Sequence, residues 1–196
     1  MPTFLIKQIK PICFFLCCLP LAYLSILFLT DQLGANPIER ITRFSGDWAL
    51  RMILITLVAT PLQRGLGAVW PFRIRRMIGL FSFFYVALHL SSYIVLDQFF
   101  DWREIFDDLI KRPFIMAGMA AFVLLIPLAV TSTRKMMRRL GKRWKQLHRM
   151  IYLIAALGVL HYFLLIKAGW FEPAIYLLVY LILMLLRAPV KGNRFR

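Results

Sequence analysis

The sequence predicts an all-α membrane protein of about six transmembrane helices. Hydrophobic residues make up 61% of the chain and the mean hydropathy is +0.71, whereas soluble domains are roughly 45–50% apolar. The apolar residues gather in six runs that approach the about 20 residues needed to cross a bilayer. Because the charged residues lie mainly between these runs, the formal charge of +16 reflects membrane topology, and we expect no nucleic-acid partner.

The six predicted spans make up one integral membrane domain over residues 1–196. The first run resembles a signal peptide because Lys7 and Lys10 precede it, but it lacks a cleavage site of the small-x-small type, so we expect a retained helix. The last run is short and is expected to extend into its flanks. In chain order, the spans are 11–30, 46–62, 77–97, 113–132, 148–167 and 173–187.

The distribution of charge predicts the orientation of the spans. When alternate connections are assigned to alternate sides, most of the 25 basic residues fall on one side and all nine acidic residues on the other. Basic residues mark the cytoplasmic side of a membrane protein. An even number of spans then places both termini in the cytoplasm, and we expect a multi-pass protein of a bacterial inner membrane.

One connection on the opposite side, 97–112, alternates aromatic residues with carboxylates. This pattern fits either a short helix at the membrane interface or a solvated loop anchored by Trp102. No internal repeat is obvious along the chain.

The chain has three histidines, His89, His148 and His161, and each lies within or at the end of a predicted span. An ionisable group at such a position suggests a functional site. Counted from the cytoplasmic ends of their spans at 1.5 Å per residue, His89 lies about 18 Å deep and His161 about 20 Å deep. The two imidazoles therefore reach the same level, nearer the outer face.

Two imidazoles at one depth on separate helices are what a six-coordinate b-type haem requires. Zinc would need a third ligand, and none is evident at this level. We therefore predict that His89 and His161 ligate the iron of a haem b. The alternative is that each histidine only forms a hydrogen bond between helices.

His148 and Arg51 are further candidate cofactor-binding residues. His148 sits at the cytoplasmic edge, where it suits a second haem iron, a flavin or quinone headgroup, or a cap at the interface. Arg51 lies inside the second span and needs an anionic partner. A haem propionate or Asp47, four residues earlier, would serve, and snorkelling to the interface is the third alternative.

Several ordered motifs carry a family resemblance. They are RRMIGLFSFFYVALH (75–89), KRPFIMAG (111–118), PLAVTS (127–132), RRLGKRWKQLHRMIY (138–152) and HYF (161–163). From about 40 to 190 the chain resembles the MsrQ (YedZ) family of haem-binding membrane subunits, within the ferric reductase-like group, whose core would correspond to about 45–165. That group typically places two histidines on each of two helices, one pair per haem. Here Arg75 or Arg76 stands at the inner position of the third span, so the resemblance implies one haem, or two with an altered inner site.

The resemblance also implies a role for the chain as a non-catalytic electron-transfer subunit. Such a subunit passes electrons from the quinone pool, or from a cytosolic flavin reductase, to the periplasmic molybdopterin enzyme MsrP, which repairs oxidised methionine in periplasmic proteins. FMN is associated with the family, although no distinct FMN motif is found. The alternatives are a ferric or other metal reductase, and a transporter or assembly protein without redox function.

Overall fold

The computed structural model describes residues 3–166 and 169–187, and the described residues form helices joined by short connections, with no strand among them. The prediction of an all-α protein is confirmed. The helices are α1 (Thr3–Leu29), α2 (Pro37–Leu66), α3 (Trp70–Ser92), a π-helical turn (Tyr93–Asp97), α4 (Trp102–Lys111), α5 (Pro113–Val130), α6 (Arg134–Leu140), α7 (Lys142–Leu147), a 3₁₀ turn (His148–Met150), α8 (Ile151–Leu165) and α9 (Phe171–Leu185).

Five segments among the described residues are long and apolar enough to cross a membrane. They are Gln8–Leu29, Pro37–Leu66, Trp70–Asp97, Pro113–Val130 and Lys142–Leu165. The sixth predicted span becomes α9, which is apolar but has only 15 residues, short of the about 20 that a span needs. The chain is therefore a multi-pass membrane protein with five full-length candidate spans and one shorter apolar helix. The end of the predicted span 148–167 lies outside the described residues.

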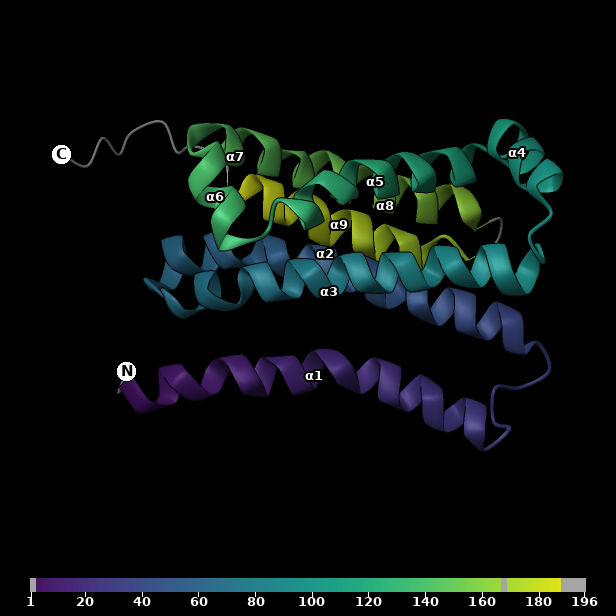
Figure 1. Ribbon diagram of the computed structural model, residues 1–196, viewed down its shortest axis with the longest axis horizontal. Helices are drawn as coiled ribbons and strands as arrows, with labels where there is room; N and C mark the ends of the chain where they lie inside the picture. The colour runs from purple at the N-terminus through teal and green to yellow at the C-terminus, as the bar shows by residue number, and fades with distance from the viewer. Residues whose placement is uncertain (1–2, 167–168, 188–196) are drawn as a thin grey trace.

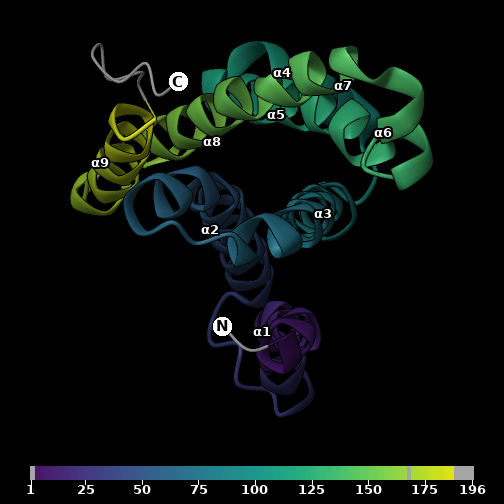
Figure 2. The ribbon, with the colours of Figure 1, turned by 90° about the vertical axis from the view of Figure 1, so that its left-hand side faces the viewer.

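The long helices run side by side, and successive connections lie at opposite ends of the bundle (Figure 1). α1 begins and α9 ends at the same end, where α6 and α7 also lie, while α4 lies at the other end. In the end-on view, α2, α3, α5, α8 and α9 surround the bundle axis, and α1 stands outside them beside α2 and α3 (Figure 2). The assignment of the α6–α7 end to the cytoplasm stays a prediction.

Local residue chemistry explains where the helices that hold the site begin and end. The Asn36 side chain accepts a hydrogen bond from the Glu39 N–H at the start of α2, which satisfies one of the unpaired donors of the first turn. α2 ends at Leu66, and the next residue, Gly67, caps it with a φ of 64°, in the left-handed region that glycine tolerates. Pro113 occupies the first position of α5, where its missing N–H costs no helical bond.

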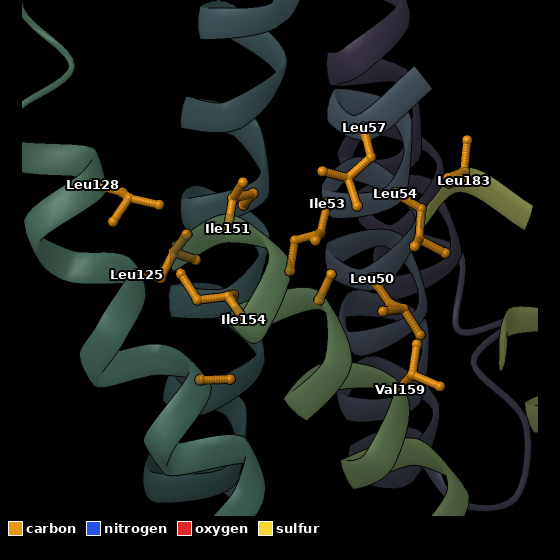
Figure 3. Close-up of a cluster of buried hydrophobic side chains, with 12 residues drawn as sticks. Leu50, Ile53, Leu54, Leu57, Leu125, Leu128, Ile151, Ile154, Val159 and Leu183 are labelled. Carbon is orange, nitrogen blue, oxygen red and sulfur yellow. The ribbon is translucent and has the colours of Figure 1, made fainter. Parts of the chain in front are cut away.

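The central core joins four helices. Buried aliphatic side chains from α2, α5, α8 and α9 meet in one cluster (Figure 3). Its labelled members are Leu50, Ile53, Leu54, Leu57, Leu125, Leu128, Ile151, Ile154, Val159 and Leu183. Because lipid is as apolar as these side chains, close packing rather than exclusion of water holds the cluster together.

Polar contacts also join α1 to α3 and the end of α9 to α2. The buried Tyr85 hydroxyl of α3 enters the hydrogen-bond ladder of α1, where it accepts from the Leu21 N–H at 3.2 Å and donates to the Cys17 carbonyl at 2.8 Å. Arg187, just after α9, donates from Nε and Nη2 to the Leu57 carbonyl of α2. Pro61, four residues after Leu57, has no N–H to offer that carbonyl, so Arg187 supplies the missing donor.

Candidate haem-binding site

His89 on α3 and His161 on α8 face each other across the bundle. The sequence predicted that they lie at the same depth. Their ring centroids lie 6.0 Å apart, and the ring planes stand at 81° to each other. The structure thus brings together two residues that are 72 positions apart in the chain.

A backbone carbonyl of a neighbouring helix orients each of the two rings. His89 Nδ1 lies 2.8 Å from the Thr42 carbonyl of α2, and His161 Nδ1 lies 2.6 Å from the Phe114 carbonyl of α5. A carbonyl only accepts hydrogen bonds, so Nδ1 carries the proton in both rings and Nε2 keeps its lone pair. Fixing Nδ1–H in this way is the usual means by which a protein orients a histidine that ligates a metal.

A glycine lies against each histidine ring. A Cβ atom on Gly46 of α2 would lie 3.0 Å from Nδ1 and Cε1 of His89, and one on Gly118 of α5 would lie 2.8 Å from Nδ1 of His161. The ring of each histidine therefore occupies the space that any larger residue would need. Sequence reasoning did not identify either glycine as part of the site.

These contacts form an internal repeat. In the first half of the chain Thr42, Gly46 and His89 make the set, and the corresponding residues of the second half are Phe114, Gly118 and His161. Each residue is separated from its counterpart by 72 positions. The bundle thus contains two matching helix pairs, α2 with α3 and α5 with α8, each of which presents one imidazole. A search for identical spacing around the histidines could have revealed this repeat. The overall sequence similarity between the two halves of the chain did not reveal it.

The spacing of the two rings fits an iron atom between them. Metal–nitrogen bonds to imidazole are about 2 Å long, so two such bonds together with the two ring radii come close to the observed 6.0 Å between centroids. Among the described residues, no group of three or more His, Cys, Asp or Glu side chains is arranged to hold a metal ion. The donor set therefore suits a haem, which needs only two axial ligands from the protein.

His148 lies at the other end of α8 in a different environment. Its Nε2 is 3.1 Å from the Thr131 hydroxyl, which donates its own hydrogen to the Pro127 carbonyl at 2.6 Å. Nε2 must then carry the proton and donate to Thr131. The Trp144 ring stacks on the imidazole with centroids 3.9 Å apart.

The surroundings of His148 do not offer a second imidazole, since the chain has only three histidines. Arg75 of α3 lies near enough to interact electrostatically with His148, as its place in the family pattern suggested. The residues at this end therefore do not reproduce the paired arrangement of His89 and His161.

Arg51 makes its closest polar contact with α9. Its Nε donates to the Tyr176 hydroxyl at 2.9 Å, while Nη2 lies 3.8 Å from the Asp47 carboxylate. The guanidinium also sits 5.1 Å from the centre of the Trp48 ring. Of the partners considered from the sequence, the structure provides Asp47, and it adds Tyr176, which sequence reasoning did not anticipate.

Comparison with known proteins identifies the family of the chain. The family model for the ferric reductase like transmembrane component matches residues 14–159. A protein-methionine-sulfoxide reductase heme-binding subunit MsrQ of Rhodospirillum rubrum is 57% identical over 164 residues, which cover 83% of this chain and 79% of the relative. The chain belongs to the MsrQ family.

Other MsrQ relatives extend the match. The heme-binding subunit of Herminiimonas arsenicoxydans is 51% identical over 183 residues, 91% of this chain and 84% of its own. That of Caulobacter vibrioides is 50% identical over 172 residues, 87% of this chain and 82% of its own. The MsrQ resemblance noted in the sequence motifs is thus confirmed.

Proposed function

We propose that this chain is a haem b electron-transfer subunit of the bacterial inner membrane and that His89 and His161 are the axial ligands of its haem. The observation that carries the proposal is the matched pair of imidazoles, each held through Nδ1 by a carbonyl of the adjacent helix. The names of the MsrQ relatives, which call them heme-binding subunits, support it.

The chain's own residues would bind and orient the cofactor. The Thr42 and Phe114 carbonyls fix the two rings with Nε2 free, and Gly46 and Gly118 leave room for the rings against α2 and α5. Hydrogen bonds from Nδ1–H make an imidazole a stronger donor to iron and thereby influence its reduction potential. When bound, the haem would supply a one-electron carrier.

The proposed acceptor is the periplasmic catalytic subunit MsrP, which would reduce methionine sulfoxide in oxidised periplasmic proteins. The names of the relatives as subunits of protein-methionine-sulfoxide reductase support this assignment. In this proposal the chain takes electrons from quinol or from a cytosolic flavin reductase, and the single imidazole of His148 lies on the entry side. FMN remains a proposal that rests on the family alone. The ferric reductase-like core is proposed to span about 45–165 of the single membrane domain.

A reconstituted system tests the direction of electron flow. The haem-loaded chain in vesicles would be reduced by a water-insoluble quinol, and MsrP would then be added with or without a methionine sulfoxide peptide. The proposal predicts that the haem is reoxidised over many turnovers only when both MsrP and the sulfoxide are present. Rapid reoxidation by ferric chelates, with none by MsrP and sulfoxide, would instead show a ferric reductase.

A matched variant excludes direct transfer from quinol to MsrP. With His161→Ala, both reduction of the membrane chain and turnover of the sulfoxide should disappear. Undiminished sulfoxide turnover with this variant would contradict the proposal, because electrons would then bypass the site.

A further inference from the structure

The helix α4 divides its surface into three faces. At about 100° per residue, Trp102, Phe106 and Ile110 form one exposed apolar stripe, with relative exposures of 57%, 63% and 80%. A second face carries charged residues: Arg103, Glu104, Asp107 and Lys111. The third contains Ile105 and Asp108, which are buried against the rest of the protein. The centres of the three faces are about a third of a turn apart.

The rotation of α4 about its own axis is fixed by Asp108. Its carboxylate accepts a hydrogen bond from the Tyr93 hydroxyl at 2.8 Å and pairs with Arg112 at 2.7 Å. Tyr93 begins the π-helical turn at the end of α3. Since Asp108 is held on the protein side, the directions of the other two faces are also fixed.

The position of α4 then determines what each face meets. The helix lies at the end of the bundle away from α6 and α7, outside α5, and is turned across the direction of the long helices (Figures 1 and 2). A helix in this position runs along the plane of the membrane surface beside the spans. With one face on the protein, a charged face turned toward water would leave the apolar stripe turned toward the bilayer.

The turn before α4 adds to the exposed apolar surface. Phe99 and Phe100 are 76% and 54% exposed, and both have positive φ values, 46° and 63°. Residues with bulky side chains rarely adopt this left-handed conformation. Such strain in two consecutive aromatic residues is typical of a segment with a role beyond connecting two helices.

We propose that α4 and the preceding turn bind the phospholipid surface of the outer leaflet, with Trp102, Phe106 and Ile110 inserted at the boundary of headgroups and acyl chains. Aromatic and aliphatic side chains favour this region when they lie on one face of a helix parallel to the surface. If the stripe instead faced a soluble partner in the water, the charged face, a third of a turn away, would have to face the lipid.

The charges of α4 indicate that apolar contact, rather than attraction to anionic lipid, holds it there. Its charged face has two basic and two acidic residues, and Lys111 Nζ lies 2.6 Å from the Asp107 carboxylate. That carboxylate raises the pKa of the Lys111 ammonium, so Lys111 stays charged. Insertion should therefore be equally deep in neutral and anionic bilayers.

This anchor has a consequence for the histidine site. α4 leads directly into α5 through Arg112 and Pro113, and the first turn of α5 contains Phe114, whose carbonyl holds His161. A lipid-bound α4 thereby fixes the depth of the segment that orients this histidine. The anchor itself does not depend on any cofactor.

Site-directed spin labelling of the full chain in phosphatidylcholine vesicles tests the proposal. The three cysteines of α1, Cys13, Cys17 and Cys18, are replaced by alanine, and a label is placed at Phe106→Cys or, as the matched control, at Asp107→Cys. Collisions with oxygen, which concentrates in lipid, and with a nickel chelate, which stays in water, are then compared. We expect the oxygen-to-nickel collision ratio to be several-fold higher at position 106 than at 107, and unchanged when phosphatidylglycerol is included.

Three results would overturn the proposal. A nickel-accessible label at both positions would place the stripe in water. A label at 106 shielded from both reagents would show that protein, such as a second copy of the chain, covers the stripe. A high ratio at 106 only when phosphatidylglycerol is present would show that charge, not apolar contact, drives insertion.

Discussion

Replacing Gly118 with alanine should weaken haem binding by displacing His161. The new Cβ would lie 2.8 Å from Nδ1, 3.1 Å from Cε1 and 3.3 Å from Cγ of the imidazole, all inside ordinary contact distance. The ring must move away from α5, and the 2.6 Å hydrogen bond to the Phe114 carbonyl then lengthens or breaks. Overpacking of this kind costs about 1–3 kcal/mol, and loss of an outer-shell contact to a metal ligand lowers affinity about 10–100-fold.

The assay is a haem titration of the purified apo-protein followed in the visible spectrum, together with a redox titration of any haem that binds. We expect an affinity about 10–100-fold weaker than that of the wild type. The midpoint potential of the retained haem should be more positive, because the imidazole loses its Nδ1–H bond to the carbonyl and becomes a weaker donor to ferric iron.

Gly79→Ala is the matched control. Gly79 also lies within a membrane helix, but a Cβ there would meet only Thr56 Cγ2 at 3.9 Å, an ordinary contact, so haem affinity should be unchanged. Wild-type affinity and potential in Gly118→Ala would refute the inference that the glycine makes room for His161. An equal loss of affinity in both variants would point to a general effect of alanine on the bundle.

Three other predictions concern residues around the site. His148→Ala should leave occupancy of the haem at His89 and His161 unchanged in the visible spectrum, because the Nε2 of His148 donates to a hydroxyl and does not ligate that haem. Loss of that haem would contradict the assignment of His89 and His161 as its ligands. Arg187→Ala should lower the unfolding free energy by about 1–3 kcal/mol in denaturant titrations, because the Leu57 carbonyl loses a charged donor; unchanged stability would show that another group replaces it. Arg51→Gln should reduce thermal stability by breaking the contact with Tyr176 while haem content stays constant, whereas loss of haem would favour a propionate contact instead.

The sequence allowed the overall architecture to be predicted because the bilayer imposes simple rules on length and hydropathy. Five predicted spans correspond to helices of sufficient length. The sixth, α9, has the 15 residues of the predicted run 173–187 but lies two residues earlier, from Phe171 to Leu185, without the expected extension to the length of a span. Counting apolar residues cannot determine whether such a run continues into its flanks, since that depends on the turns at each end.

The candidate ligands could be predicted from the sequence, but the residues that orient them could not. Counting residues along two helices was enough to place His89 and His161 at one level, and the structure brings their rings together. Their hydrogen-bond partners are the backbone carbonyls of Thr42 and Phe114, and a carbonyl leaves no trace in residue identity. Gly46 and Gly118 are recognisable only once the neighbouring helix is known, since small residues also serve ordinary packing in membranes.

The two interpretations left open for the 97–112 connection differ in one property, the rotation of the helix. An alternating pattern of aromatics and carboxylates does not say which face meets the protein. The bond between Tyr93 and Asp108 supplies that information, and it joins residues on two different helical segments. This contact turns an ambiguous amphipathic pattern into a proposal about lipid binding.

The most direct test of the account is the reduced-minus-oxidised visible spectrum of the purified protein, with haem quantified per chain, for the wild type, His89→Ala and His161→Ala. The account predicts the spectrum of a six-coordinate haem b in the wild type and its loss in both variants, because each removes one of two axial ligands. A wild type that binds no haem when haem is abundant, or two variants that keep the full spectrum, would contradict the claim that His89 and His161 hold the haem.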